Sequence, residues 1–299
     1  MGNQKTNQRV GEICIIISAV FFGMMPLLAK TAYSSGSNSY SVAFYRFFFG
    51  AILLFFVVQI LQRDSVMITI RQIRWIFLLS IPYACMPILL YKSYDYISSG
   101  LATTLHFTYP VFVVVISMIV FHERTGAKKV FSCILCVFGI VLLYTPDGSV
   151  SILGIVMALI SGIVYGIYVI LLGRSDLENL SVLKQGFWLS VFSALEIGAV
   201  AVFMDKLTWN IQGRGWIAQI LMALLTTVIA LVLFQRGTYI CGSVKASLLS
   251  AFEPLTGVFI GVTILQESLN WKISLGIILI LISTVLLVLP ERRRDKLII

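Results

Sequence analysis

A few ionisable residues interrupt the long apolar runs of this chain, and they are its strongest candidates for chemistry. Glu253, Arg46 and Glu196 each lie inside such a run. An ionisable side chain in an apolar segment of membrane length is costly to bury, so it usually has a function. A carboxyl group there can bind an amine or another cation, carry a proton or pair with an arginine. Three alternatives remain open: Arg46 pairs with Glu253, it pairs with Glu196, or each group stays free.

His106 and Tyr109 form a second candidate group. Their i, i+3 spacing places both on one face of a helix, just before Pro110. Histidine titrates near neutral pH, so His106 suits a proton site if it faces water, and a packing role is the alternative. Aromatic residues at similar depths in other runs could bound an aromatic or cationic solute. They are Phe22, Tyr45, Tyr83, Tyr91, Phe107, Tyr165, Tyr168 and Trp188.

Two prolines interrupt apolar runs at corresponding places. A proline inside a helix has no N–H and displaces the carbonyl four residues earlier. Pro110 is therefore expected to free the carbonyl of His106, and Pro254 that of Ser250. Non-helical backbone at membrane depth is tolerated only where protein or a water-filled cavity satisfies it. We expect both prolines to kink their helices and both kinks to face the interior.

The elements that must position these residues are membrane helices. Of 299 residues, 59% are hydrophobic and 12% are charged, and the mean hydropathy is +0.98. Soluble domains are about 45 to 50% apolar and about 25% charged. A helix needs about 20 apolar residues to cross a bilayer. Ten runs meet this requirement, at 12–30, 39–61, 74–96, 98–121, 128–145, 152–173, 183–204, 216–237, 243–265 and 271–289.

The second half of the chain repeats features of the first at an offset of 144 positions. Five helices per copy is an odd number, so the second copy must enter the membrane in the opposite orientation. The sequence thus predicts an all-α membrane protein with ten transmembrane helices as two inverted five-helix repeats, at 1–147 and 148–299. The matching residues are Pro110, Glu123 and Pro146 in the first copy and Pro254, Glu267 and Pro290 in the second.

The positive charges orient this architecture, because Lys and Arg concentrate in cytoplasmic loops. With the amino terminus inside, 16 of the 22 Lys and Arg residues lie in inner segments, five lie in outer segments, and Arg46 lies within a helix. We therefore expect a multi-pass protein of the cytoplasmic membrane with both termini in the cytoplasm. The formal net charge of +9 is explained by this bias and by contact with lipid headgroups, so no nucleic-acid partner is expected.

Other kinds of chemistry find little support in the sequence. All five cysteines lie within or at the ends of apolar runs, and Cys133 and Cys136 have no histidine or acid nearby, so no metal or other cofactor is expected. An enzyme would need converging acids, histidines or a nucleophile, and a channel would need rings of polar residues around a pore. The two histidines and 13 acids, mostly at helix ends, favour neither class.

At this point the chain resembles a known family, the EamA-type transporters of the drug/metabolite transporter superfamily. The resemblance rests on two signature runs and covers essentially the whole chain. One departure is that a glycine usually precedes each closing glutamate, whereas His122 and Gln266 stand here. The first run carries Thr103, Thr104, Tyr109, Pro110 and Glu123, and the second carries Ser247, Glu253, Pro254 and Glu267.

The resemblance implies a carrier of small metabolites, amino acids among them, with a central cavity between the two halves. We expect a secondary transporter that works by alternating access, with Glu253, His106 and Tyr109 near its site. Export of an amino acid or related solute is favoured by the resemblance, and import of a quaternary amine or another small nutrient is the alternative. The expected partners are a small-molecule substrate, the lipid bilayer, a coupling proton and, through the fifth and tenth helices, a second copy in a homodimer.

Overall fold

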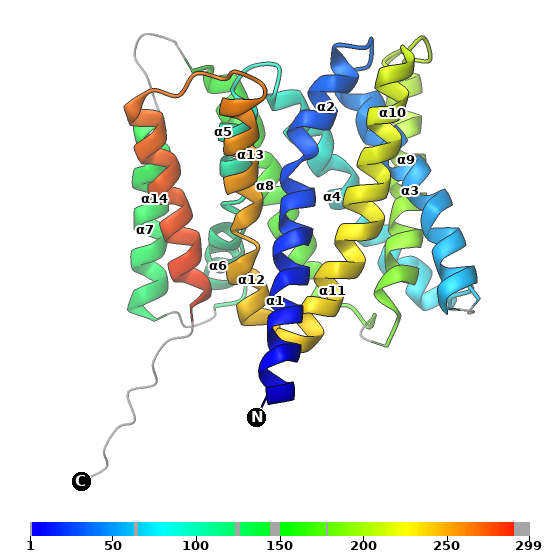
Figure 1. Cartoon of the computed structure of the whole chain (residues 1–299), viewed down its shortest axis with the longest axis horizontal. Coiled ribbons are helices and arrows are strands. Elements are labelled where there is room, and N and C mark those ends of the chain that lie inside the picture. Colours follow the sequence, from blue (N-terminus) through cyan, green and yellow to red (C-terminus); the bar gives the residue numbers. More distant parts are fainter. Residues whose placement is uncertain (1, 63–64, 123–125, 144–149, 178, 290–299) are drawn as a thin grey trace.

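The computed structural model describes residues 2–62, 65–122, 126–143, 150–177 and 179–289. Within these ranges the chain is helical and has no β-strand. The helices stand side by side in one bundle, which confirms an all-α membrane protein (Figure 1). The repeat residues Glu123, Pro146 and Pro290 lie outside the described residues.

The helical elements follow one another with short connections. In chain order they are α1 (Gly2–Gly23), α2 (Met25–Tyr33), α3 (Ser39–Val57), the π-helical η1 (Val58–Gln62), α4 (Ile70–Ser93), α5 (Ser99–His106), α6 (Tyr109–Val120), α7 (Ala127–Leu142), α8 (Ile152–Leu172), α9 (Val182–Phe203), α10 (Gly213–Met222), the π-helical η2 (Ala223–Ile229), α11 (Ala230–Cys241), α12 (Ser243–Leu249), α13 (Phe252–Thr263) and α14 (Trp271–Val288).

Eight helical stretches in the described residues are long and apolar enough to cross a membrane. They correspond to eight of the ten predicted runs, with ends that differ by a few residues. The other two runs are α7, which has 16 residues, and the interrupted pair α12 and α13. Because these are shorter than a full span, the ten-helix count and the inverted repeat stay predictions.

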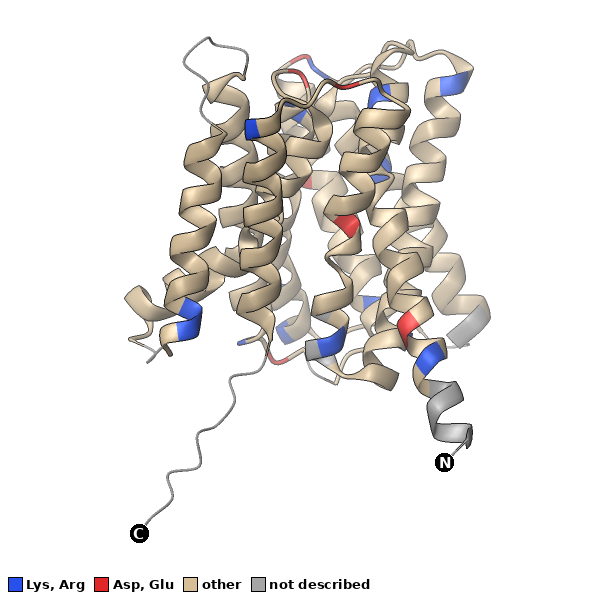
Figure 2. Cartoon of the chain, turned by 60° about the vertical axis from the view of Figure 1, so that its left-hand side comes forward, with Lys and Arg blue, Asp and Glu red and all other residues tan. Residues whose placement is uncertain are grey.

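The charged residues gather near the two ends of the bundle, and few lie at mid-height (Figure 2). We call the end that holds the start of α1 and the turn between α11 and α12 the amino-terminal face (Figure 1). The other end, with the turns at 34–38, 94–98 and 264–270, is the opposite face. The apolar middle between these faces has the pattern expected of a membrane-embedded bundle.

Two pairs of helices are interrupted in the middle of the bundle. In the first pair, α5 ends at His106 and α6 begins at Tyr109, so Pro110 lies in the first turn of α6. In the second pair Pro254 lies in the first turn of α13. The missing N–H of proline costs nothing in a first turn. The expectation of a proline inside a continuous, kinked helix is therefore wrong in detail, because each proline opens a new helix.

The carbonyl groups at these interruptions also differ from expectation. The carbonyl of Ser250 accepts a hydrogen bond from the N–H of Glu253 at 2.9 Å, so Pro254 does not free it. The carbonyl of His106 faces Gly162 of α8, where an added Cβ atom would come within 2.9 Å of it. Because Gly162 has no side chain, the α8 backbone packs directly on the first interruption.

The turns after α6 and α13 explain why glycine is usual at one position of each family signature. His122 and Gln266, which stand at the positions where glycine is usual, have φ angles of 54° and 55°. This is the left-handed region, which glycine occupies at little cost and other residues rarely occupy. The two copies thus form the same kind of turn, and a glycine would relieve strain in each.

The long helix from Gly213 to Cys241 contains a π-helical segment. This segment, η2, spans Ala223–Ile229 and includes Thr226 and Thr227. A π segment widens the helix and disturbs the regular backbone bonding, and such segments are frequent at functional sites. The hydroxyl group of Ser18 donates a hydrogen bond to the carbonyl of Ala230, directly after the segment, at 2.7 Å. The distortion is thereby satisfied by a side chain of another helix.

Candidate functional site

A cavity of about 570 Å³ lies in the middle of the bundle and is the candidate site. At its deep end it is lined by Arg46 and Leu90, and at its other end by Val182 and Tyr239, near the amino-terminal face. The Tyr239 side chain is 92% exposed, so the cavity reaches the molecular surface on this face. The cavity is therefore open to the surface near the amino-terminal face.

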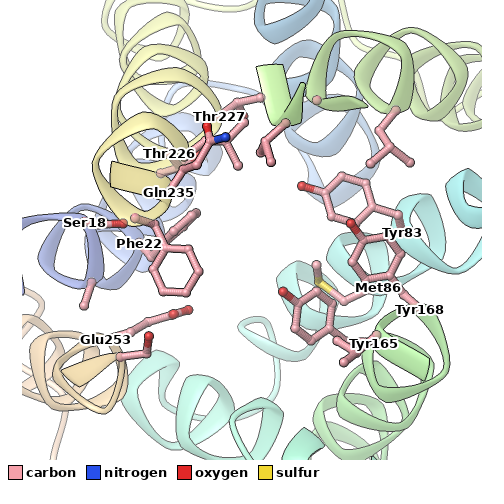
Figure 3. A pocket seen from close by; sticks show the side chains of 18 of the residues that line it. Ser18, Phe22, Tyr83, Met86, Tyr165, Tyr168, Thr226, Thr227, Gln235 and Glu253 are labelled. Atoms are coloured by element: carbon pink, nitrogen blue, oxygen red, sulfur yellow. The ribbon is translucent and has the colours of Figure 1, made fainter. Parts of the chain in front are cut away.

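Seven of the eight residues expected along the pathway line this cavity. Glu253, on α13, and Phe22, on α1, face Tyr83 and Tyr165 across it (Figure 3). The seven lining residues are Glu253, His106, Tyr109, Arg46, Phe22, Tyr83 and Tyr165. Pro110 lines a smaller neighbouring cavity of about 220 Å³, and Pro254 is buried beside Glu253.

Glu253 extends its carboxyl group into the cavity (Figure 3). The first turn of α13 positions it, directly after the interruption. The carboxyl group makes no hydrogen bond or ion pair with any residue that the structure describes. A carboxyl group at this depth without a protein partner is costly unless a ligand, water or a proton satisfies it.

Arg46 lies on α3 and is only 4% exposed. One terminal nitrogen, Nη1, donates to the hydroxyl group of Tyr91 at 2.8 Å, and Nε donates to Thr227 Oγ1 of η2 at 3.4 Å. The other terminal nitrogen has no partner in the described part of the chain, and it is absent from the buried unpartnered atoms. Because Arg46 lines the cavity, this nitrogen is available to a bound molecule.

Arg46 and Glu253 are near enough to attract each other but do not form an ion pair. The alternative that they form a salt bridge is therefore wrong for this state of the protein. Arg46 bonds to two hydroxyl groups instead, and its carboxylate counterpart stays free. One cavity thus presents a cation and an acid that are not paired with each other.

Glu196 is separate from the cavity. It is the one expected pathway residue that does not line it. The Glu196 carboxyl group lies 2.5 Å from the hydroxyl oxygen of Ser80 on α4, and its second oxygen is buried without a partner within the described ranges. Arg46 does not approach it, so the alternative pair Arg46 and Glu196 is also wrong. The helices α3 and α9 touch, but Glu196 points towards α4.

Tyrosines form the wall opposite Glu253 (Figure 3). The rings of Tyr165 and Tyr168 are stacked with centroids 5.6 Å apart, and Tyr83 lies 4.9 Å from Tyr168. Tyr109 meets Tyr165 edge to face at 4.7 Å. The hydroxyl groups of these four tyrosines have no hydrogen-bond partner among the described residues, so they are free to contact a ligand. The cavity is thus aromatic and polar on one side and acidic on the other.

Comparisons with known proteins agree with this architecture. The EamA-like transporter family matches the chain twice, over residues 9–145 and 152–289. This chain belongs to that family. Three bacterial relatives of this EamA-like protein are named uncharacterised transporters. They come from Synechocystis sp. (sll1319; 27% identity over 67% of this chain and 62% of the relative), Clostridium kluyveri (22% over 92% of each) and Bacillus subtilis (YoaV; 25% over 79% of this chain and 82% of the relative).

A solved crystal structure shares the fold of this EamA-like protein. Its TM-score is 0.61 at 14% identity, and the match covers 95% of this chain and 97% of the other. Taken with the family and the membrane-length helices, the chain is an integral membrane transporter of small solutes. The family and its named relatives are transporters and not enzymes.

An ion pair joins three segments at the opposite face of the transporter. Lys30, on α2, donates to Glu267 at 2.6 Å, and both the backbone N–H and the hydroxyl group of Ser99 donate to the same carboxylate oxygen at 2.9 and 2.8 Å. Burial alone would raise the pKa of Glu267, but the bonds from Lys30 and Ser99 outweigh burial and lower it. The carboxylate thus joins α2, the start of α5 and the turn after α13.

Two of the expected aromatic residues play other parts in this EamA-like protein. The Tyr45 hydroxyl donates to the carbonyl of Thr208, at the opposite face, and the indole of Trp188 donates to the carbonyl of Val66, near the amino-terminal face. Neither lines the cavity, so they anchor loops. Among the described residues, no group of three or more His, Cys, Asp or Glu could hold a metal.

Several lining residues were not expected from the sequence. Thr226, Thr227 and Gln235 line the cavity from η2 and α11, and Ser18 lines it from α1 (Figure 3). Polar residues in an apolar membrane helix are a weak signal of a binding site, because most of them bond to the backbone of their own helix. The change of face that brings both threonines inwards follows from the π segment, which has no clear sequence signature.

Proposed function

We propose that this transporter is a secondary carrier of a small zwitterionic metabolite, such as an amino acid or a related solute. The observation that carries the proposal is the pair of opposite, unpaired charges on one cavity, Arg46 and Glu253. A solute carboxylate would bind to Arg46, and its ammonium group would bind to Glu253. The rest of the solute would lie against Tyr83, Tyr165 and Tyr168.

The electrostatics of the cavity support this assignment. A charge in an apolar interior needs an opposite charge or several hydrogen bonds, and Glu253 has neither from the described protein. A hydrogen bond to a charged group contributes about 1.5 to 3 kcal/mol. A zwitterion supplies both missing partners at once and keeps the loaded cavity electrically balanced. A solute with one charge leaves one of the two protein groups unpaired.

The proposed architecture is the ten-helix arrangement of two inverted repeats, 1–147 and 148–299, with both termini in the cytoplasm. The amino-terminal face is then cytoplasmic, and the cavity opens inwards while the contact between Lys30 and Glu267 closes the outside. Alternating access would open that contact and close the cytoplasmic end. In this orientation the carrier loads from the cytoplasm of its cell, which favours export.

Glu253 is also the proposed coupling residue. The sequence has no nucleotide-binding motif, so a gradient of ions or solutes must supply the energy. A single carboxyl group can hold either a proton or an ammonium group, and this competition would couple proton entry to solute exit. The outward faces of α7 and α14 are apolar, and they are the proposed surface for lipid or for a homodimer.

A second candidate is import of a quaternary amine, and the tyrosine wall favours it. Tyrosine rings bind quaternary ammonium groups through their faces, and Tyr83, Tyr165 and Tyr168 stand close together opposite the acid. Such a solute would use Glu253 but not Arg46. The two candidates therefore differ in whether the solute needs a carboxylate.

Binding to the purified protein tests both candidates. Aromatic and aliphatic L-amino acids, their methyl esters, their N-acetyl derivatives and choline are compared by thermal shift and by uptake into proteoliposomes. We expect the amino acids to bind at least about tenfold more tightly than either derivative. Glu253→Gln should remove the preference over the N-acetyl compounds, and Arg46→Lys should reduce the preference over the esters. Binding of choline alone would contradict the zwitterion and support the alternative.

A further inference from the structure

We propose that His106 is a specificity residue whose Nε2 atom accepts a hydrogen bond from an N–H or O–H group at the uncharged end of the solute. The inference rests on the proposed function for its biological meaning, but not for the state of the ring. It follows from the direction of the hydrogen bond between His106 and Ser161.

Ser161 decides which ring nitrogen carries the proton. Its hydroxyl oxygen lies 2.6 Å from the carbonyl of Ala158 and 3.0 Å from Nδ1 of His106. A carbonyl can only accept, and a serine has one proton to donate. The shorter contact takes that proton, which is the usual bond of a helical serine to its preceding turn. Ser161 must then accept from His106, so Nδ1 carries the hydrogen.

A neutral imidazole with its proton on Nδ1 has a lone pair on Nε2. His106 is 6% exposed and lines the cavity. Its Nε2 atom has no partner among the described residues, and it is absent from the buried unpartnered atoms. The atom is therefore reachable from the cavity. The ring presents one acceptor to a bound molecule.

Neighbouring groups hold this acceptor in a fixed place. The His106 ring lies 5.4 Å from Tyr165 and 6.3 Å from Tyr109, and α5 ends at His106 itself. Gly162 brings α8 close enough for Ser161 to reach the ring. The acceptor thus lies beside Tyr109 and Tyr165 on the cavity wall, within electrostatic range of Arg46.

The charged groups on the same cavity are Arg46 of α3 and Glu253 of α13. Under the proposed function both are occupied by the charges of the solute. The four tyrosine hydroxyl groups can donate or accept, so they adapt to many solutes. Nε2 of His106, by contrast, can only accept a hydrogen bond, because the ring proton is on Nδ1. An uncharged solute end without a donor therefore leaves Nε2 unpaired, and such a solute should bind several-fold more weakly.

Nitrogen NMR tests the state of the ring without any solute. The chain has only two histidines, so selective ¹⁵N-histidine labelling gives two ring signals, and His122→Asn identifies the one from His106. Protonated and lone-pair nitrogens resonate far apart. We expect the proton on Nδ1 in the wild type and a mixture of tautomers in Ser161→Ala. A proton on Nε2 in the wild type would overturn the proposal.

Matched solutes and variants test the role. The probes are L-tryptophan against 1-methyl-L-tryptophan and L-tyrosine against O-methyl-L-tyrosine. Wild type should prefer the unmethylated member at least about fivefold. His106→Asn keeps a donor for Ser161 but cannot reach the solute, so the preference should disappear. His106→Gln places an amide oxygen near the former Nε2 position and should restore part of it.

Two outcomes separate the role from the proposed function. An equal preference in wild type and His106→Asn, with both proteins folded, would overturn the specificity role while the carrier function stands. If no amino acid binds at all, the proposed function fails, and the specificity role fails with it. The NMR result then still decides the tautomer alone. Loss of folding in His106→Asn would be seen as loss of the thermal transition, and Ser161→Ala would replace it as the test variant.

Discussion

The two interrupted helix pairs, α5–α6 and α12–α13, have nearly the same backbone but different chemistry. Each pair breaks in mid-bundle and restarts with a proline in its first turn. Yet the residue before the proline is Tyr109 in one pair and Glu253 in the other, 144 positions later. The duplicated backbone thus supplies two equivalent positions that face one cavity, and one of them is aromatic while the other is acidic.

The starts of the two pairs differ as well. Ser98 caps the start of α5, and Glu267 accepts from the N–H groups of Ser99 and Gly100. The start of α12 follows Gly242, which has a φ of 82° and gives no side-chain cap. Four backbone N–H groups at each helix start need partners. The α5–α6 pair is therefore tied to the opposite face through its first N–H groups, while the α12–α13 pair is tied to α1 near the amino-terminal face by the ion pair between Lys245 and Glu12.

The largest expected effect on transport is at Glu253, and the equivalent position, Tyr109, should show a smaller one. Glu253→Gln removes the charge with little change in shape, and it should reduce gradient-driven transport at least about tenfold. Tyr109→Phe keeps the ring and removes one hydroxyl group, so its transport should fall only a few-fold. Uptake into proteoliposomes and thermal unfolding measure the two variants. Equal losses in folded proteins would contradict the division of roles.

The second-largest effect is expected when the contact of Glu267 with Lys30 and Ser99 at the opposite face is broken. Glu267→Gln removes the charge that binds Lys30 and caps α5, and it should lower the free energy of unfolding by about 1 to 3 kcal/mol. Thr256 of α13 packs against Gly23 at the end of α1. The same change should raise the reactivity of a cysteine placed at Thr256 towards an impermeant thiol reagent added from the opposite side. Ser98→Ala, which removes only the second cap, is the matched control.

The lowered pKa of Glu267 gives this tie a pH dependence. A carboxyl group whose pKa is depressed on folding stabilises the protein fully above its unfolded pKa of about 4.3. That stability is lost as pH falls through the lower folded pKa. Acid on the opposite side should therefore open the tie in the wild type. Because thiol reactivity itself falls with pH, it is expressed relative to that of the same cysteine in Glu267→Gln, and this ratio of wild type to variant should rise as pH falls.

The two turns with left-handed residues allow a test of their similarity. His122→Gly and Gln266→Gly should each stabilise the protein by about 1 kcal/mol, because glycine removes the strain of a positive φ. Thermal unfolding measures each variant against its alanine counterpart, which keeps the strain. Stabilisation in only one copy would show that the two turns are energetically different.

The prolines should have a smaller effect on stability. Pro110→Ala and Pro254→Ala change a first-turn position where no backbone bond is lost, so stability should change by less than about 1 kcal/mol. The interchange of open and closed states should slow if alanine lets the helices straighten. Stopped-flow exchange measures that rate. Unchanged rates in both variants would mean that the interruptions do not depend on proline.

Glu196→Gln should have the smallest effect. Its carboxyl group contacts Ser80 away from the cavity, and an amide can replace that contact, so transport should stay within about twofold and stability within about 0.5 kcal/mol. Ser80→Ala, which leaves the carboxyl group without this partner, is the comparison and should cost more. A large loss of transport in Glu196→Gln would place Glu196 in the coupling pathway.

Much of the fold could be predicted because a membrane helix is recognised from a run of about 20 apolar residues. The helix ends agree within a few residues, and Glu253, His106 and Tyr109 reach the cavity as the apolar runs indicated. These predictions depend on local sequence alone. Depth along a helix and the cost of burying charge need no knowledge of neighbouring helices.

The partners of these residues could not be predicted, because they depend on packing between distant segments. Glu267 meets Lys30 across 237 positions, and Arg46 meets Thr227 across 181. Nothing in the sequence near Arg46 indicated that Tyr91 would bind it in place of an acid. Glu196 was expected along the pathway because of its depth, but rotation about the α9 axis points it towards Ser80.

The wide turns of η2 let the long helix hold an extra residue without turning the segment that follows. A regular α-helix with one inserted residue would rotate everything after it by about 100° about the axis, whereas a π segment takes up the insertion within its own wider turn. Removing a single residue from Ala223–Ile229 and closing the segment to an α-helix would therefore leave Gln235 and Thr238 facing the cavity. The change would be confined to Thr226 and Thr227, so one deletion could alter a single stretch of the cavity wall and leave the rest of that wall in place.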